Sequence, residues 1–261
     1  MKLAWIAAAA ASLAFGAHAE TCPEYVGKIV KLQPYSEVRS KLPKLTEKAE
    51  FETTEQFKAR LGKSAPSEIF TIAKTGNAEA KYDADKGGFN FTREALGVVG
   101  LGGFETIGEF NPLEAVVKQD GYVEGLIPLI MDGQIIVLSD LLSPSGTYPG
   151  ANAFGAKTTV RAYNEQVSAI LNAGADNSSV RVAFAPVNIN EAKTLKANLK
   201  IAYVFQYSNP FLVRGEERSA ATIDDPRDVT TRFEIITGSV KCGLLVSGID
   251  SRVIGSVSIV E

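Results

Sequence analysis

An alternation of apolar and polar residues with a period of two most constrains the fold of this 261-residue chain. Between residues 199 and 208 the odd positions carry leucine, isoleucine, tyrosine and phenylalanine, whereas lysine, glutamine and serine occur among the even positions. Successive side chains of a strand point to opposite faces, so this pattern predicts a half-buried strand. Residues 229–236 alternate in the same way, and 240–246 and 253–259 are further runs of strand length. We therefore expect a set of antiparallel strands in the C-terminal third.

Short strand signals recur through the rest of the chain, with turn residues between them. The predicted strands are 68–74, 78–83, 89–92, 123–130, 134–138 and 180–184, and the predicted helices are 53–62 and 190–197. Residues 131–133 contain Asp-Gly, which predicts a tight hairpin turn. Residues 156–171 fit either a strand or a helix, whereas the Pro, Gly and Ser content of 143–150 predicts a loop.

Many short strands and few helices predict an α+β, mainly β fold, with antiparallel sheets in a sandwich-like arrangement. Residues 20–64 are expected to form a charged N-terminal segment with one short helix. Residues 65–261 are expected to form the mainly antiparallel β domain. A break near residues 172–179 leaves open a division of that domain into two subdomains.

Residues 1–19 have the features of a secretory signal peptide. Lys2 provides the positive start, residues 3–16 form an uncharged apolar run, and Ala17-His18-Ala19 is a small-x-small cleavage signal. The alternative, an N-terminal core helix, does not account for the order of these three parts. The sequence predicts cleavage after Ala19 and a periplasmic or secreted bacterial protein. No later stretch reaches the length of a transmembrane helix, so none is expected in the mature chain.

Loss of residues 1–19 removes the only histidine, His18, and the only tryptophan, Trp5. A mature chain without imidazole excludes Ser-His-Asp and Cys-His nucleophiles, because histidine is the base in both. It also argues against the usual zinc and copper sites. The chain has 27 basic and 30 acidic residues and no basic stripe, so a nucleic-acid partner is not expected. No glycine-rich segment completes a phosphate-binding motif, and no cofactor is predicted.

The two cysteines, Cys22 and Cys242, are predicted to form a disulfide in an oxidising compartment. The bond would join the mature N-terminus to a C-terminal strand. The alternative is two unpaired thiols, one of them buried in a strand.

A partial calcium-loop pattern runs from Asp83 through Asp85 to Glu94. These acids fall at positions 1, 3 and 12 of an EF-hand loop, and glycine falls at position 6. Position 5 is Gly87, which has no side-chain oxygen, and the flanking residues predict strands rather than helices. A Gly-Gly hairpin turn therefore explains the segment better than a calcium site.

Paired carboxylates are the remaining common catalytic device, because glycosidases need only two acids. The candidate acids are Glu105, Glu109, Asp120, Glu124, Asp132 and Asp140. Tyr148 and Phe154 lie in or beside the predicted loop 143–150 and form a possible ligand loop. The alternatives are a solvated surface for the acids and simple loop anchors for the aromatic residues.

The segment Phe51-Glu52-Thr53-Thr54-Glu55-Gln56-Phe57-Lys58-Ala59-Arg60-Leu61 resembles a segment of a loose group of uncharacterised bacterial envelope proteins. Residues 152–155, 225–226 and 230–232 also resemble that group. The resemblance implies an extracytoplasmic mixed domain without a known activity, and it assigns no functional residue.

Because the catalytic side chains are so depleted, the sequence favours a non-catalytic envelope module that binds a protein, a glycan or a lipid through loops or a sheet edge. The first alternative is a carboxylate-dependent hydrolase of envelope glycans. The second is a structural or assembly subunit that acts by strand pairing.

Overall fold

The computed structural model describes residues 21–42, 49–64, 66–91, 96, 98–100, 105–108, 115–118, 127–129, 133–151, 154–173 and 183–259. The signal sequence predicted at 1–19 lies outside these residues. The helical elements are η1 (Cys22–Tyr25), α1 (Tyr35–Ser40), α2 (Thr54–Ser64), α3 (Ile189–Leu195) and η2 (Lys196–Asn198). The strands are β1 (Phe70–Ala73), β2 (Lys81–Asp83), β3 (Gly88–Phe91), β4 (Val98–Gly100), β5 (Glu105–Gly108), β6 (Ala115–Lys118), β7 (Ile127–Leu129), β8 (Gly133–Ala151), β9 (Lys157–Ala173), β10 (Ala183–Pro186), β11 (Leu199–Ser219), β12 (Arg227–Ser247) and β13 (Val253–Ser258).

The fold is mainly β, with antiparallel pairing dominant and a few short helices, which confirms the predicted fold class. Most strands form one sheet in the order β4-β8-β9-β12-β11-β6-β5-β7, and β1 and β13 add to β11 and β12. Two pairs within it, β9–β12 and β6–β11, are parallel. Strands β10, β3 and β2 form a second, smaller sheet. Ala185 and Phe91 of this small sheet face Gly255 of β13, so the two sheets meet there.

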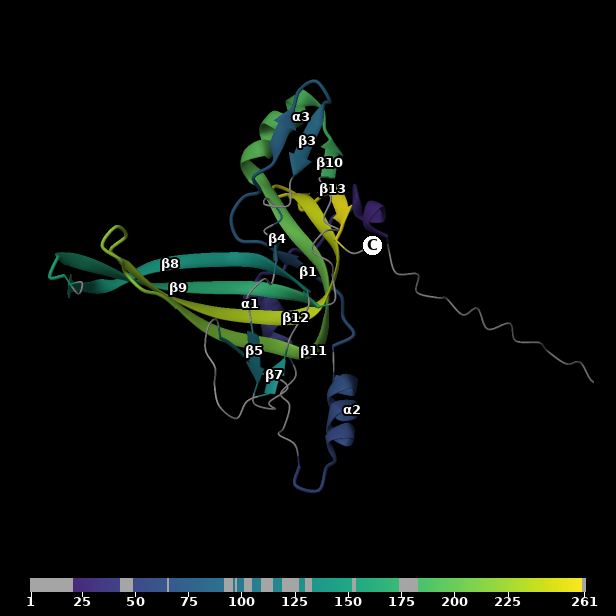
Figure 1. Ribbon diagram of the computed structural model, residues 1–261. Helices are drawn as coiled ribbons and strands as arrows, with labels where there is room; N and C mark the ends of the chain where they lie inside the picture. The colour runs from purple at the N-terminus through teal and green to yellow at the C-terminus, as the bar shows by residue number, and fades with distance from the viewer. Residues whose placement is uncertain are drawn as a thin grey trace, which may run out of the picture.

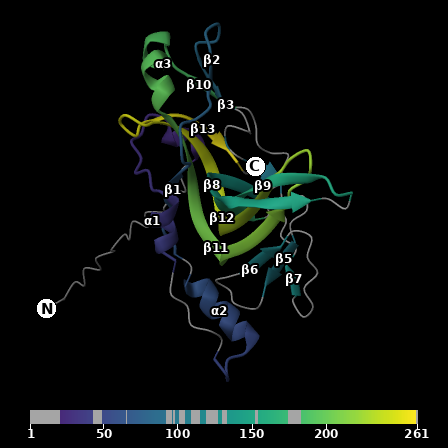
Figure 2. The ribbon, with the colours of Figure 1, turned by 90° about the vertical axis from the view of Figure 1, so that its left-hand side faces the viewer.

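The long strands β8, β9, β11 and β12 extend from the body of the molecule as an arm (Figure 1). The hairpins β8–β9 and β11–β12 lie side by side, because β9 and β12 pair in parallel from Arg161 and Arg227 onward. Both hairpin turns are therefore at the same, free end. We define the arm as residues 139–168 and 212–236. Figure 2, which views the molecule with this end toward the reader, shows the sheet curving from β8 through β12 to β11.

The main core lies in the body and is rich in aromatic side chains. Tyr207 contacts Phe70, Phe205 and Phe211 edge to face. Its hydroxyl donates to the carbonyl oxygen of Val38 in α1 at 2.6 Å, which satisfies a polar group that would otherwise be buried without a partner. The helix α1 is thus packed and hydrogen-bonded onto the sheet.

Strand β12 continues through the region where the sequence pattern predicts two strands, 229–236 and 240–246. The sheet bends there through two irregularities in the β11–β12 register. At one of them the Thr237 hydroxyl accepts from the Phe211 amide at 2.7 Å and donates to the Ser208 carbonyl at 2.6 Å. The bulge therefore keeps its backbone groups bonded, and the strand passes through the bend without interruption.

Candidate interaction site

The outer edge of β8 is the part of the arm most open to a partner. Strand β4 pairs with β8 only at residues 134–136, and the Thr75 amide donates to the Leu138 carbonyl at 2.7 Å. Beyond Leu138 no strand within the described part of the chain pairs with β8 on this side. We call residues 139–151 the β8 edge. Figure 1 shows that β8 forms the border of the arm. Unpaired backbone groups of an edge strand can accept another strand.

The side chains of the β8 edge are apolar or small and almost free of charge. Leu141 and Leu142 are 67% and 48% exposed, and as consecutive strand residues they project from opposite faces. No charged residue occurs from Leu141 to Ala151. Pro144 and Pro149 remove two donors, and the register shifts between Pro144 and Gly146. These features block strand addition beyond Ser143, so residues 139–143 are the open segment of the edge.

Two acidic side chains lie on one face of the arm, and one of them, the exposed Asp140, belongs to this open segment. Asp140 of β8 is opposite Val167, and Leu142 is opposite Glu165, which puts Asp140 and Glu165 on one face of the arm, a diagonal step apart. Glu165 accepts from the Thr231 hydroxyl of β12 at 2.5 Å, which joins β9 and β12. Burial, and then the neighbouring Glu165 carboxyl, raise the pKa of the Asp140 carboxyl. The two acids are therefore electrostatically coupled neighbours on one face of the arm.

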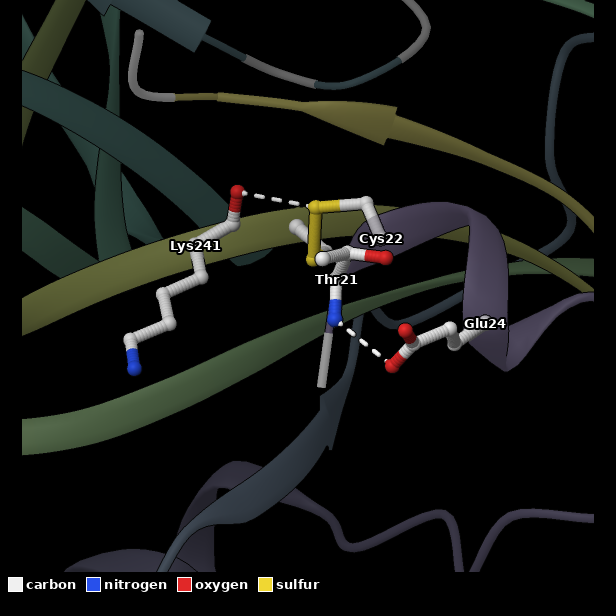
Figure 3. Close-up of a disulfide and its surroundings, with 5 residues drawn as sticks. Thr21, Cys22, Glu24 and Lys241 are labelled. Carbon is white, nitrogen blue, oxygen red and sulfur yellow. Dashed lines mark hydrogen bonds between the residues drawn. A yellow bond between two sulfur atoms is a disulfide. The ribbon is translucent and has the colours of Figure 1, made fainter. Parts of the chain in front are cut away.

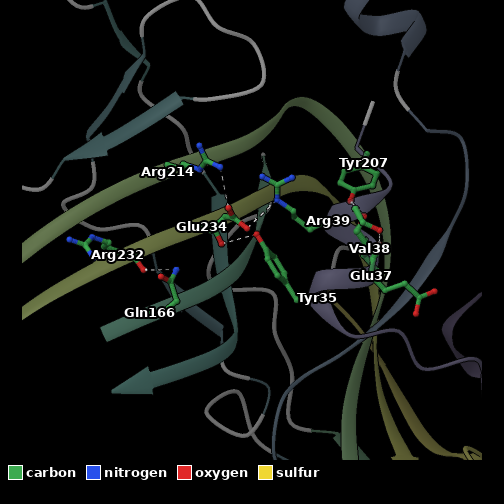
Figure 4. Close-up of polar contacts among 10 residues, drawn as sticks. Tyr35, Glu37, Val38, Arg39, Gln166, Tyr207, Arg214, Arg232 and Glu234 are labelled. Atoms are coloured by element: carbon green, nitrogen blue, oxygen red, sulfur yellow. Dashed lines mark hydrogen bonds and ion pairs between the residues drawn. The ribbon is translucent and has the colours of Figure 1, made fainter. Parts of the chain in front are cut away.

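The opposite face of the arm carries two ion pairs between β11 and β12, of which Figure 4 shows Arg214 with Glu234. Arg214 is the register partner of Glu234, and Glu216 is the register partner of Arg232. Their charged atoms are 3.5 Å and 3.0 Å apart, respectively. A shift of register would bring like charges together, so the two ion pairs favour the observed alignment of these long strands.

Glu234 also connects the arm to α1. Its carboxylate accepts from Arg39 at 3.3 Å, and its backbone carbonyl accepts from the Tyr35 hydroxyl at 3.0 Å (Figure 4). Desolvation, with the neighbouring Glu234, raises the pKa of Tyr35 well above its ordinary value, so this hydroxyl stays a donor. The base of the arm is fixed to the body through α1.

Tyr148, predicted in a ligand loop, lies instead in the long strand β8, and the prediction of a loop at 143–150 is wrong. The Pro, Gly and Ser content of this segment is typical of a loop, but an edge strand also tolerates proline at positions where no backbone donor is needed. The Tyr148 hydroxyl donates to Asp228 at 2.5 Å, and Arg218 bonds the same carboxylate through two nitrogens. These donors lower the pKa of Asp228 to about 2. Phe154 lies in the turn between β8 and β9 and is 96% exposed. The two aromatic residues therefore do not form one loop.

The predicted disulfide between Cys22 and Cys242 is present (Figure 3). The Cα atoms are 5.5 Å apart, and the Cys22 sulfur lies 3.4 Å from the carbonyl oxygen of Lys241. Cys242 is buried among Val204, Leu244 and Val246, on a sheet face that Tyr25, Val30 and Leu32 of the N-terminal segment cover in part. The bond thus fastens that segment to the middle of the large sheet.

The calcium-loop candidate forms a hairpin turn between β2 and β3. Asp83 accepts from the amides of Asp85 and Lys86 at 3.1 Å each, so its carboxylate closes the turn. Gly87 has a φ of +68°, which favours glycine. Glu94 lies outside the described residues. Within the described part of the chain, no group of three or more His, Cys, Asp and Glu residues is placed to hold a metal ion.

Of the candidate acids for catalysis, the structure places Asp140 on the same face of the arm as Glu165. Glu105 belongs to β5, and its side chain is not described. Glu109, Asp120, Glu124 and Asp132 lie outside the described residues. This neighbour of Asp140 was not identified from sequence. Their proximity depends on the β8–β9 register, and no local pattern around either residue indicates it.

None of the helices described here is both long and apolar enough to cross a membrane. No protein-family model matches the chain, and no curated protein or solved structure is significantly similar to it.

Proposed function

We propose that this protein is a non-catalytic interaction module of the bacterial envelope, which binds an extended segment of a partner protein at the β8 edge. The observation that carries the proposal is the open segment 139–143. Its outer side pairs with no strand among the described residues, and it has an exposed leucine on each face. An incoming strand would gain backbone hydrogen bonds and cover Leu141 and Leu142 together.

An envelope location fits the export features of residues 1–19 and the Cys22–Cys242 disulfide. Disulfides of this kind persist in oxidising compartments such as the periplasm. The depletion of catalytic side chains supports a binding role.

The energetics predict a weak complex at this segment alone. In a five-residue pairing two or three residues face the partner, and each exchanges two backbone hydrogen bonds, so about four to six bonds form, each contributing about 1 kcal/mol net. Covering the two half-exposed leucines adds about 2–3 kcal/mol. The loss of rotational and translational freedom, at least about 4 kcal/mol, offsets half of this gain or more. The partner therefore makes further contacts along the arm or binds transiently.

Site-specific photo-crosslinking tests the proposal. A photoreactive residue replaces Leu141 in one variant and Ile249, which is 59% exposed in the turn between β12 and β13, in the control. Irradiation of the producing bacterium should give a discrete adduct for position 141 and not for position 249. Unlabelled Leu141→Lys protein should not compete for this adduct, whereas unlabelled Ile249→Lys protein should.

Failure to obtain an adduct at position 141, or the same adduct at both positions, would refute strand addition at β8. The adduct mass also distinguishes the partner. A product of twice the mass of the protein would identify a second copy of the chain and favour assembly by strand pairing.

A further inference from the structure

We propose that the free end of the arm docks on an anionic lipid bilayer and inserts Phe154 among the lipid headgroups. We define the arm tip as residues 147–161 and 218–228, which contain both hairpin turns. This site goes beyond the proposed function, because it lies past the open segment 139–143 and contacts lipid rather than an extended peptide.

The two turns of the arm tip present apolar side chains at the end of the arm that points away from the body (Figure 1). Phe154 is 96% exposed, and the Gly155 that follows it has a φ of +82°, which lets the chain turn back into β9. Ile223 is 45% exposed in the β11–β12 turn. No charged residue occurs within 141–156, so nothing in this hairpin opposes transfer from water to the boundary of headgroups and acyl chains.

Cationic side chains follow directly behind the apolar turn. Lys157 and Arg161 are exposed and four residues apart in β9, so they lie on one face of the strand, about 13 Å from each other. Neither forms an ion pair within the part of the chain that the structure describes. Arg227, the register partner of Arg161, binds Asp225 through two nitrogens at 2.7 and 2.6 Å, so the charge of this acid is already balanced.

The arm tip is more positive than the chain as a whole, which has 27 basic and 30 acidic residues. The charged residues of the tip are the basic Lys157, Arg161, Arg218 and Arg227 and the acidic Asp224, Asp225 and Asp228. Two of these acids are paired, Asp228 with Arg218 and Asp225 with Arg227. Lys157 and Arg161 thus remain against Asp224 alone, and anionic headgroups are the complementary surface.

The arm tip is also held in one arrangement before it meets a membrane. Tyr148 of β8 donates to Asp228 of β12 at 2.5 Å, and Arg218 of β11 binds the same carboxylate at 3.0 and 2.6 Å. This contact reaches across the arm from one hairpin to the other. Docking therefore requires no new arrangement of the strands, and little conformational entropy is lost on binding.

A tryptophan at position 154 tests the insertion directly, because Trp5 is the only tryptophan of the chain. The variant Trp5→Phe/Phe154→Trp has its single tryptophan at the tip, and the control Trp5→Phe/Ile189→Trp has it at a 51% exposed position of α3 in the body. Vesicles of phosphatidylglycerol and phosphatidylcholine in equal parts should shift the emission of the tip variant to shorter wavelength. Lipids brominated on the acyl chains should quench it, and the control should show neither effect.

Vesicle co-sedimentation measures the contribution of each part of the tip. Phe154→Ser should weaken binding about tenfold, and Ile189→Ser should not. Lys157→Gln/Arg161→Gln should weaken binding about 30-fold, because each cation near an anionic surface contributes about fivefold. Lys193→Gln/Lys196→Gln removes the same charge from exposed positions of the body and should bind as the wild type does. Added salt should weaken binding of the wild type.

An emission spectrum of the tip variant that vesicles leave unchanged, or equal shifts at positions 154 and 189, would overturn the proposal. Equal affinity of the wild type for vesicles with and without phosphatidylglycerol would also overturn it. An emission shift that grows with protein concentration in the absence of vesicles would place a second copy of the chain at the tip instead of lipid. The photo-crosslink at position 141 probes a different segment, so failure of either site leaves the other standing.

Discussion

Removal of the disulfide should cost the protein about 5 kcal/mol of unfolding free energy at 25 °C without destroying its fold. The bond joins residues 220 positions apart. A chain-entropy estimate for a loop of this length gives about 5 kcal/mol, because the cross-link excludes most extended conformations of the unfolded chain. Native domains are stable by only about 5–15 kcal/mol, so the bond supplies a large share of the total.

The native contacts of the N-terminal segment indicate that it stays in place without the bond. The Gly27 and Val30 amides donate to the carbonyls of Val253 and Ser251, and the Val253 amide donates to Lys28, at 2.8–3.0 Å. These hydrogen bonds contribute about 3 kcal/mol in total. The double variant Cys22→Ala/Cys242→Ala should therefore keep the wild-type circular dichroism spectrum and unfold at a lower urea concentration.

Urea unfolding of the double variant and of the reduced wild type separates the contribution of the cross-link to the free energy of unfolding from that of side-chain packing. Reduction keeps both sulfur atoms, whereas the alanines also remove a buried sulfur, which should destabilise the variant by about a further 1 kcal/mol. Both proteins should show a larger dependence of free energy on urea, because their unfolded chains expose more surface. A loss below about 2 kcal/mol in both would contradict the entropic argument.

Two further substitutions test the arm and the bend. In Tyr148→Phe the Asp228 carboxylate loses one hydrogen-bond donor, so its pKa should rise above about 2. A carboxyl NMR titration measures this pKa, and an unchanged value would show that Arg218 alone lowers it. Gly238→Ala places a Cβ against the Gln206 carbonyl and the Phe205 ring, so urea unfolding should show a loss of about 2–3 kcal/mol, and a neutral result would refute that close packing.

Strands in which apolar and polar residues alternate could be predicted from the sequence. The joining of two such segments into one continuous strand could not. Residues 199–207 were correctly predicted to form a strand, the first part of β11, but the strand is not half-buried, because Ala202 and Val204 on its second face are buried as well. The break expected between 229–236 and 240–246 is a bend within β12, because Thr237 satisfies the backbone across it. A side chain that bonds groups 26 and 29 residues away leaves no local signal in the sequence.

Within the candidate site, the sequence predicted a specific contact only for the cysteines. Two cysteines allow a single pairing, and Cys22–Cys242 is confirmed. Asp140 was one of several candidate acids, and Glu165 was missed because register decides their proximity. The β8 edge was hidden because proline and glycine at 143–150 are typical of a loop, although an edge strand accepts them.

Because β12 is continuous, it connects the free end of the arm mechanically to the body. The strand runs from Arg227 near the free end to Ser247 in the body, and it is paired with β9 and β11 along the arm and with β11 and β13 in the body. A pull on the free end along the strand axis would load these hydrogen bonds in shear, many at once, rather than open them one after another. A partner held by the arm would therefore transmit tension or displacement directly to the core of the molecule.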